Sequence, residues 1–326
     1  MWNVSMSLGF KSGLRRLLGR PKDNVVTGTS EPDAALEVLR EEAENPVQGR
    51  RAEQIRVFEQ GRLRLIYETT IRAGKPLVVV FSGVDTHAGR CATSYYGLHW
   101  QLDASVVHIH DNFGAHGNYL LQLDKDPTVG WATVKLLRQL MSETGTTPRD
   151  LWLVGTSKGA TTALCMALML RAGNCIAAEP QILLGDFFYP DDRDWSVHEE
   201  LRGLAYAMTG RVNIEDKPAL NAIVPTLLRR WLLQYKGKML VVFGKGTGYY
   251  QQHIIHLDNA IKQIQRNAPG KAKDLRVTLR KEPFNRHIDV VPVFLDMLFK
   301  QFGILDPDPS IDPDTARPEP AQEKQL

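Results

Sequence analysis

The sequence of 326 residues has little cysteine, no long apolar run and no large excess of either charge. Its three cysteines, Cys91, Cys165 and Cys175, are an odd set without zinc-ligand spacing, so we expect neither a disulfide framework nor a metal site. No run approaches the roughly 18 consecutive apolar residues of a membrane span, and the amino terminus lacks the apolar segment of a secretory signal. These absences, together with free thiols that fit a reducing compartment, predict a cytoplasmic protein.

The charge balance gives no reason to expect nucleic acid as a partner. Lysine and arginine total 40 against 37 aspartate and glutamate, which leaves a formal charge of +3 at neutral pH. Much of this small excess lies near the amino terminus, and the middle of the chain is close to neutral. Residues 6–20 mix leucine and phenylalanine with arginine and lysine. They suit either a flexible basic leader or a short amphipathic helix in weak contact with an anionic membrane surface.

The composition divides the chain into three parts. Residues 1–59 are expected to form the basic, partly flexible leader and a helix, and residues 60–303 carry the folded domain. Residues 304–326 contain a proline every few positions, several acids and hardly any large apolar side chain. Such a tail cannot bury a core face, so we predict that it is disordered.

Short apolar runs rich in β-formers alternate with helical periodicity between residues 60 and 303. This alternation predicts an α/β fold, a mostly parallel sheet flanked by helices. A stretch from about 195 to 235 breaks the pattern with two successive helical segments, which we interpret as a helical cap inserted over the carboxyl edge of the sheet. Strands are expected at 63–67, 77–81, 105–110, 151–154, 175–178, 239–243 and 275–279, and helices at 129–141, 157–171, 254–264 and 288–302.

The sequence Gly155-Thr156-Ser157-Lys158-Gly159 joins an apolar strand to a helix that is apolar on nearly every side. A serine in this position is held on a tight strand-to-helix turn with its hydroxyl at the edge of the sheet, and the flanking glycines let the backbones pass. The alternative is a purely structural turn between strand and helix. We predict that Ser157 is a nucleophile.

Two further elements fit a serine-dependent reaction. The strand 77–81 ends in Ser82-Gly83-Val84, where an amide of Gly83 or Val84 could pair with the amide of Lys158 to form an oxyanion hole. His287 follows the last predicted strand and precedes the closing helix, which is the chain position of the base in such enzymes.

The acid that would orient the base is less clear from the residues. The loop after the strand 239–243 contains no carboxylate, although most enzymes of this layout place the acid there. We prefer Asp186, which follows the preceding strand, with Glu179 second. Asp258 remains an alternative, but it falls midway along a predicted helix.

The segment His108-Ile109-His110-Asp111 superficially resembles a metal site. Strand spacing places both histidines on one face, but no partner motif supplies further ligands, so we expect no metal and no cofactor. Residues 111–119 follow a central strand at the edge where α/β folds bind ligands, which predicts a loop on the substrate side.

With the serine, the glycine turn and the histidine in this order, residues 60–303 resemble the α/β-hydrolase superfamily. Within it, four phrases resemble capsular polysaccharide biosynthesis proteins of the XcbB/CpsF type. The phrases are Phe81-Ser82-Gly83, Asp111-Asn112-Phe113-Gly114, Gly155 to Gly159, and Tyr250-Gln251-Gln252-His253-Ile254. This resemblance implies a bacterial protein that acts on a surface glycan, moving or removing an acyl group.

The residues therefore predict a serine-dependent acyl hydrolase or O-acyltransferase that forms an acyl-enzyme at Ser157. Its expected partner is a small acyl ester or a surface glycan. The alternative is a non-catalytic glycan-assembly or binding protein on a hydrolase fold, which the missing carboxylate after the strand 239–243 favours.

Overall fold

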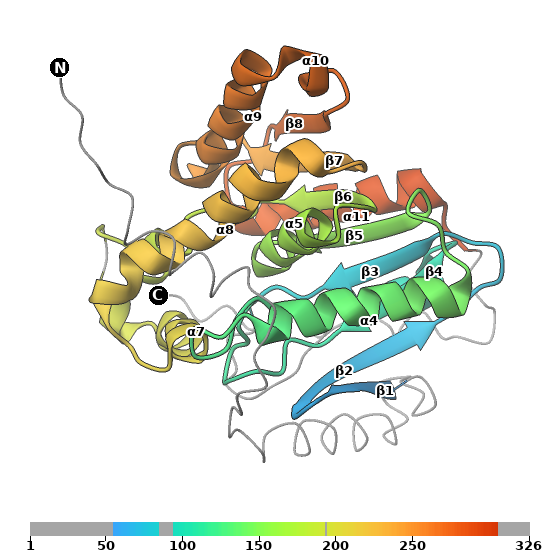
Figure 1. Cartoon of the computed structure of the whole chain (residues 1–326), viewed down its shortest axis with the longest axis horizontal. Helices are drawn as coiled ribbons and strands as arrows, with labels where there is room; N and C mark the ends of the chain where they lie inside the picture. The colour runs from blue at the N-terminus through green and yellow to red at the C-terminus, as the bar shows by residue number, and fades with distance from the viewer. Residues whose placement is uncertain (1–54, 85–93, 193, 306–326) are drawn as a thin grey trace.

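Eight strands form one sheet in the computed structural model, which describes residues 55–84, 94–192 and 194–305 (Figure 1). The strand order is β1-β2-β4-β3-β5-β6-β7-β8, and all neighbours from β4 to β8 run parallel. Only β1 and β2 are antiparallel to their neighbours. The strands are β1 (Ile55–Gln60), β2 (Leu63–Thr70), β3 (Leu77–Phe81), β4 (Ser105–Ile109), β5 (Leu151–Thr156), β6 (Asn174–Ala178), β7 (Lys238–Gly244) and β8 (Arg276–Glu282).

The predicted mostly parallel sheet is confirmed, and each of the seven predicted strands overlaps an observed one. Among the described residues the sheet begins with β1 at Ile55, five residues before the domain start predicted at residue 60, and the side chains of β1 are half-exposed or exposed. The basic leader at 6–20 with its membrane contact, the acidic tail from residue 306 and Cys91 lie outside the described residues.

Helices cover both faces of the sheet (Figure 1). The larger core contains buried side chains of α4 (Thr128–Thr144), α5 (Lys158–Leu170), α8 (Lys217–Trp231) and α9 (Ile255–Asn267). The smaller core on the opposite face lies beneath α3 (Leu98–Gln101) and α11 (Val290–Phe302). Every residue of α5 is buried, as its nearly uniform apolar composition requires. No helix in the described ranges has the length and apolar character needed to cross a membrane.

The helical insertion between β6 and β7 is also confirmed. It contains α6 (Leu184–Phe188), α7 (Glu199–Thr209) and α8, with short 3₁₀ turns η3 (Trp195–Val197), η4 (Ile214–Asp216) and η5 (Leu232–Gln234). The end of α7 lies against the loop after β4, because the N–H groups of Asp124 and Lys125 donate to carbonyls of Ala207 and Met208 at 3.0 and 2.8 Å. The helix α8 instead packs on α5 and α6. Of the two long helices, α7 therefore lies at the carboxyl edge.

Candidate active site

Ser157 lies on a strained turn between β5 and α5. Its backbone has φ 53° and ψ −122°, a conformation that residues with a side chain adopt rarely and at an energetic cost. The Ser157 N–H donates to the carbonyl of Ala178 at the end of β6 (2.9 Å), which fixes the turn against the neighbouring strand. The hydroxyl is thereby held at the carboxyl edge of the sheet.

Both glycines of the motif are required by close packing. A Cβ atom on Gly155 would lie 2.5 Å from the carbonyl carbon of Gly159. A Cβ atom on Gly159 would lie 2.0 Å from the carbonyl oxygen of Phe81 in β3. The helix therefore begins in direct contact with two strands, which is the backbone arrangement of a nucleophile elbow.

The carboxylate that contacts His287 belongs to Glu179, the first residue after β6. His287 Nδ1–H donates to Glu179 Oε2, and the other carboxylate oxygen accepts from the Gly244 N–H at 3.1 Å and from the Thr247 hydroxyl at 2.6 Å. Glu179 is fully buried and has a positive φ of 55°, whereas the His287 side chain is 42% exposed. Because Nδ1 carries the donated proton, the lone pair of His287 lies on Nε2.

The structure corrects the preference for Asp186 as the partner of His287. Asp186 lies in α6, where its partly exposed carboxylate accepts from Asn221 at 2.9 Å and lies 3.5 Å from the Lys217 ammonium. The other alternative, Asp258, lies in α9, where it accepts from the hydroxyl of Tyr250 and the ammonium of Lys262. The fully buried Glu179 takes the position because it follows β6 directly, as Ser157 follows the adjacent β5.

The structure adds two residues that the sequence did not indicate, Gln181 and Tyr249. Gln181 Nε2 donates to Ser157 Oγ at 2.9 Å and to the Tyr249 hydroxyl at 3.1 Å, and the Tyr249 ring stacks on His287 with centroids 4.9 Å apart. A continuous series of contacts thus joins the serine to the histidine. Within the described residues no hydrogen bond joins Ser157 to His287 directly, which is common in enzymes without substrate.

His253 supports the backbone next to Gln181. Its Nδ1 accepts from the N–H groups of Ile182 and Leu183 at 3.3 and 3.4 Å, which requires a neutral ring nitrogen. Burial lowers the pKa of His253 to about 4. The segment carrying Gln181 is therefore held by a histidine that stays neutral near pH 7.

One predicted oxyanion donor has another partner. The Gly83 N–H donates to the Ser94 hydroxyl at 3.1 Å, so it does not point into an oxyanion hole in this structure. The N–H groups of Val84 and Lys158 donate to no other group among the residues described. These two amides remain the candidates for stabilising an oxyanion beside Ser157.

A buried ion pair fixes the predicted substrate-side loop to the residue after the serine. Lys158 Nζ donates to Asp111 at 2.6 Å, and the two side chains are only 3% and 6% exposed. The same carboxylate accepts from the N–H groups of Asn118 and Tyr119, so it closes the loop 111–119 on itself. The loop after β4 therefore lies beside the elbow, as its position in the sequence predicts.

This loop also contains buried polar atoms that need partners. Neither the amide nitrogen nor the amide oxygen of Asn112 bonds to a described residue, and the same holds for Asn118 Nδ2 and the Tyr119 hydroxyl. Each such group costs about 1–3 kcal/mol when it is buried without a hydrogen bond. Buried polar groups in this state are suited to bind ordered water.

His108 and His110, the two histidines of the segment that superficially resembles a metal site, contact different partners. His108 contacts His99 at 2.9 Å, whereas His110 contacts Glu68 at 2.8 Å. Both histidines are buried, and burial holds the pKa of His108 well below its usual range. No group of three or more histidine, cysteine or acidic residues in the described part of the chain is arranged to hold a metal ion.

Comparison with known proteins gives matches in structure only. No family model matches the sequence, and no curated protein matches it. A capsule O-acetyltransferase of Neisseria meningitidis serogroup A is similar with a TM-score of 0.55 and 17% identity, over 76% of this chain and 93% of that one. A mutant of the same enzyme in complex with CoA matches with a TM-score of 0.51 and 17% identity, over 75% of this chain and 94% of that one.

A protein associated with glycosylation is also similar in structure. The Glycosylation Associate Protein (Gap123) complex from Streptococcus agalactiae matches with a TM-score of 0.58 and 15% identity, over 78% of this chain but only 48% of that one. Three further features agree with this fold: the strand order, the strained serine, and the order of Ser157, Glu179 and His287 along the chain. The fold is that of an α/β-hydrolase. The expected fold is thus supported, whereas membership of the superfamily and the resemblance to XcbB/CpsF-type proteins stay predictions.

Proposed function

We propose that this protein is a serine-dependent acyltransferase that places an acyl group on a bacterial surface glycan. The observation that carries the proposal is the contact of His287 with the buried Glu179, joined to the elbow serine Ser157 through Tyr249 and Gln181. A carboxylate that fixes the Nδ1–H tautomer leaves Nε2 to accept the serine proton. Residues that follow β5, β6 and β8 thus supply a nucleophile, an acid and a base.

The proposed first step forms an acyl-enzyme. Ser157 Oγ attacks the acyl carbonyl and gives its proton to His287 Nε2, and the amides of Lys158 and Val84 stabilise the negative oxygen. The intermediate collapses when the leaving group departs with the proton from His287. In the second step a sugar hydroxyl attacks the serine ester and gives its proton to His287, which returns a proton to Ser157 Oγ as the acylated sugar leaves.

The choice of acceptor rests on similarity and on the loop beside the serine. The similar Neisseria enzyme is a capsule O-acetyltransferase, and the sequence resemblance also implies a capsule protein. Loop 111–119 lies next to the elbow through the ion pair between Asp111 and Lys158, where it can line the acceptor side of the site. A transferase must react with the sugar hydroxyl faster than with water. The helix α7 can help to exclude water, because its residues Gly203 and Ala207 lie against His116 and Gly114 of the loop.

A non-catalytic glycan-binding function is the second candidate. It is favoured by the hydrogen bond from Gln181 to Ser157 Oγ, since the described residues show no bond from the serine to His287. A serine fixed in this way would be unreactive if substrate did not release it.

Covalent labelling separates these candidates. We expect a fluorophosphonate probe to label the wild-type protein and not the Ser157→Ala variant, with both folded by circular dichroism. Equal labelling of the two proteins would place the nucleophile elsewhere, and no labelling of either would favour the binding function.

A second assay tests transfer against hydrolysis. We expect acetate release from p-nitrophenyl acetate or acetyl-CoA to be slow in water and ester consumption to rise when a bacterial surface oligosaccharide is added. Acetylated sugar should then appear by mass spectrometry. Rapid acetate release that no glycan diverts would make the protein an esterase.

A further inference from the structure

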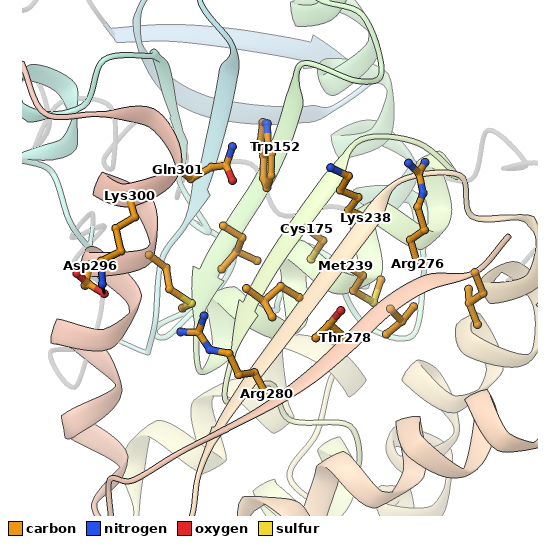
Figure 2. Close-up of a pocket in the computed structure, with 15 residues that line it drawn as sticks. Trp152, Cys175, Lys238, Met239, Arg276, Thr278, Arg280, Asp296, Lys300 and Gln301 are labelled. Atoms are coloured by element: carbon orange, nitrogen blue, oxygen red, sulfur yellow. Dashed lines mark hydrogen bonds and ion pairs between the residues drawn. The ribbon is translucent and has the colours of Figure 1, made fainter. Parts of the chain in front are cut away.

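A groove lies between β6, β7 and β8 and the helix α11 (Figure 2). It reaches Lys238 and Arg276 at the starts of β7 and β8, whereas Ser157 follows the end of β5. Its volume is about 730 Å³. The floor is apolar, with Ile176, Leu240 and Met297, and the half-buried Trp152 lines one side. Four basic side chains line the groove against a single acidic one, Asp296, so its charge is strongly positive.

Two of the four basic residues already have carboxylate partners. Arg280 pairs with Glu282 at 2.5 Å, and Lys300 pairs with Asp296 at 2.7 Å. Arg280 extends from β8 toward α11 in Figure 2. These pairs neutralise part of the groove, so its net positive charge must come from the other two cations.

Lys238 and Arg276 carry that charge. They are directly opposite each other in the register of β7 and β8, which places their Cα atoms about 4.8 Å apart on the same face of the sheet. Neither forms an ion pair with a carboxylate in the described ranges, and the Arg276 guanidinium donates to the Lys236 carbonyl. Figure 2 shows both side chains at one end of the groove.

Like charges directly opposite on neighbouring strands destabilise a sheet. An anion between Lys238 and Arg276 would remove this repulsion, and both side chains are exposed enough to reach it. Register places Trp152, at the start of β5, in line with the start of β6 and two strands from β7. The groove thus offers the Trp152 ring on one side and the Lys238 and Arg276 cations on the other. This combination suits a ligand that has both an apolar ring face and a negative charge.

We propose that this groove binds an anionic glycan, with a sugar ring against Trp152 and its carboxylate or phosphodiester groups between Lys238 and Arg276. The choice of a glycan over another polyanion rests on the proposed function. The groove does not contain Ser157, so it would hold one part of a polymer while another part reaches the serine. A defect in the groove should therefore weaken polymer binding and leave the reaction with a small ester unchanged.

Fluorescence anisotropy with labelled oligosaccharides tests this proposal. The probes are an oligogalacturonate with carboxylates, a glycerol-phosphate oligomer with phosphodiesters and a neutral maltohexaose. We expect the anionic probes to bind and the neutral one not to, and the tighter anionic probe identifies the charged group. The variant Lys238→Glu/Arg276→Glu should bind at least about tenfold more weakly, because two attractions become repulsions.

The control variant Lys135→Glu/Arg138→Glu makes the same charge change on exposed positions of α4 and should bind as the wild type does. Equal binding by the groove variant and the control would overturn the proposal, as would equal binding of maltohexaose. Tighter binding of a single-stranded oligonucleotide through the same two residues would make the groove a nucleic-acid site instead. Repeating the measurement with Ser157→Ala separates glycan binding from the acyl chemistry, since failure of serine labelling leaves these affinities unchanged.

Discussion

Replacing Glu179 by glutamine tests the acid of the proposed triad with almost no change in shape. Glu179 Oε1 accepts hydrogen bonds from the Gly244 N–H and the Thr247 hydroxyl. A glutamine must therefore keep its carbonyl oxygen on that side, because only oxygen can accept from both donors. Its NH₂ group then faces His287 Nδ1, where the carboxylate stood.

This exchange reverses the tautomer of the histidine. An NH₂ donor at Nδ1 requires a lone pair there and moves the ring proton to Nε2, so the ring can no longer accept the serine proton. Loss of the correct tautomer in a serine–histidine–acid triad lowers turnover about 10⁴-fold, equivalent to about 5 kcal/mol of transition-state stabilisation. We expect a loss of this size in kcat/KM for Glu179→Gln, measured with p-nitrophenyl acetate at neutral pH.

The matched control is Asp186→Asn, which makes the same chemical change in a carboxylate that is 43% exposed and bonded to Asn221. We expect its kcat/KM to stay within about threefold of wild type, because surface changes away from the site have small effects. Circular dichroism verifies that both variants fold. Wild-type turnover in Glu179→Gln, or an equal loss in Asp186→Asn, would refute the assignment of the acid.

Three other predictions follow from single residues. Gly159→Ala should destabilise the protein by about 3 kcal/mol in urea unfolding, because its Cβ would lie 2.0 Å from a β3 carbonyl oxygen. The control Gly270→Ala should leave the stability unchanged, because no atom lies within 4 Å of its Cβ. The pKa of His253 is about 4 when folded and 6.5 in the reference state, so the unfolded chain binds its proton more tightly and stability falls as pH drops from 6.5 toward 4. Between pH 7.5 and 5 this difference lowers the free energy of unfolding by about 2 kcal/mol. The variant His253→Asn keeps an acceptor and should lose that part of the pH dependence. An equal dependence of the unfolding free energy on pH in both proteins would contradict the prediction. Gln181→Glu should slow fluorophosphonate labelling of Ser157 more than Gln181→Met does, because a carboxylate competes with His287 for the serine proton. Slower labelling of Gln181→Met would show that residue 181 does not affect this proton transfer.

The sequence predicts the sheet well where strands are buried and apolar. The strand Leu77–Phe81 is predicted with its observed bounds, because five consecutive buried residues give an unambiguous pattern. The edge strand β1 is missed because Ile55–Gln60 forms neither a continuous apolar run nor a strict alternation of apolar and polar residues. The elbow is predictable for a different reason. Gly155 and Gly159 flank Ser157 at positions where the backbones are too close for a Cβ atom, so the spacing of the glycines indicates this contact.

The remainder of the candidate site depends on contacts between distant segments. Glu179 has a positive φ, which a sequence does not reveal, although its position directly after β6 is a signal that favours it over Asp186. The contact between Gly83 and Ser94 and the donation from Gln181 to Ser157 depend on how loops approach each other. No local pattern encodes these approaches.

The order of the site residues along the chain also bears on protein synthesis. Ser157 and Glu179 follow two neighbouring strands whose pairing places Thr156 beside Ala178. His287 comes 108 residues after Glu179, so the ribosome adds it only when β7 and β8 have already been made. A nascent chain that ends before this point contains the serine and the acid without the base. Under the proposed mechanism, truncated products of this protein would carry an inert serine and could not consume acyl donors.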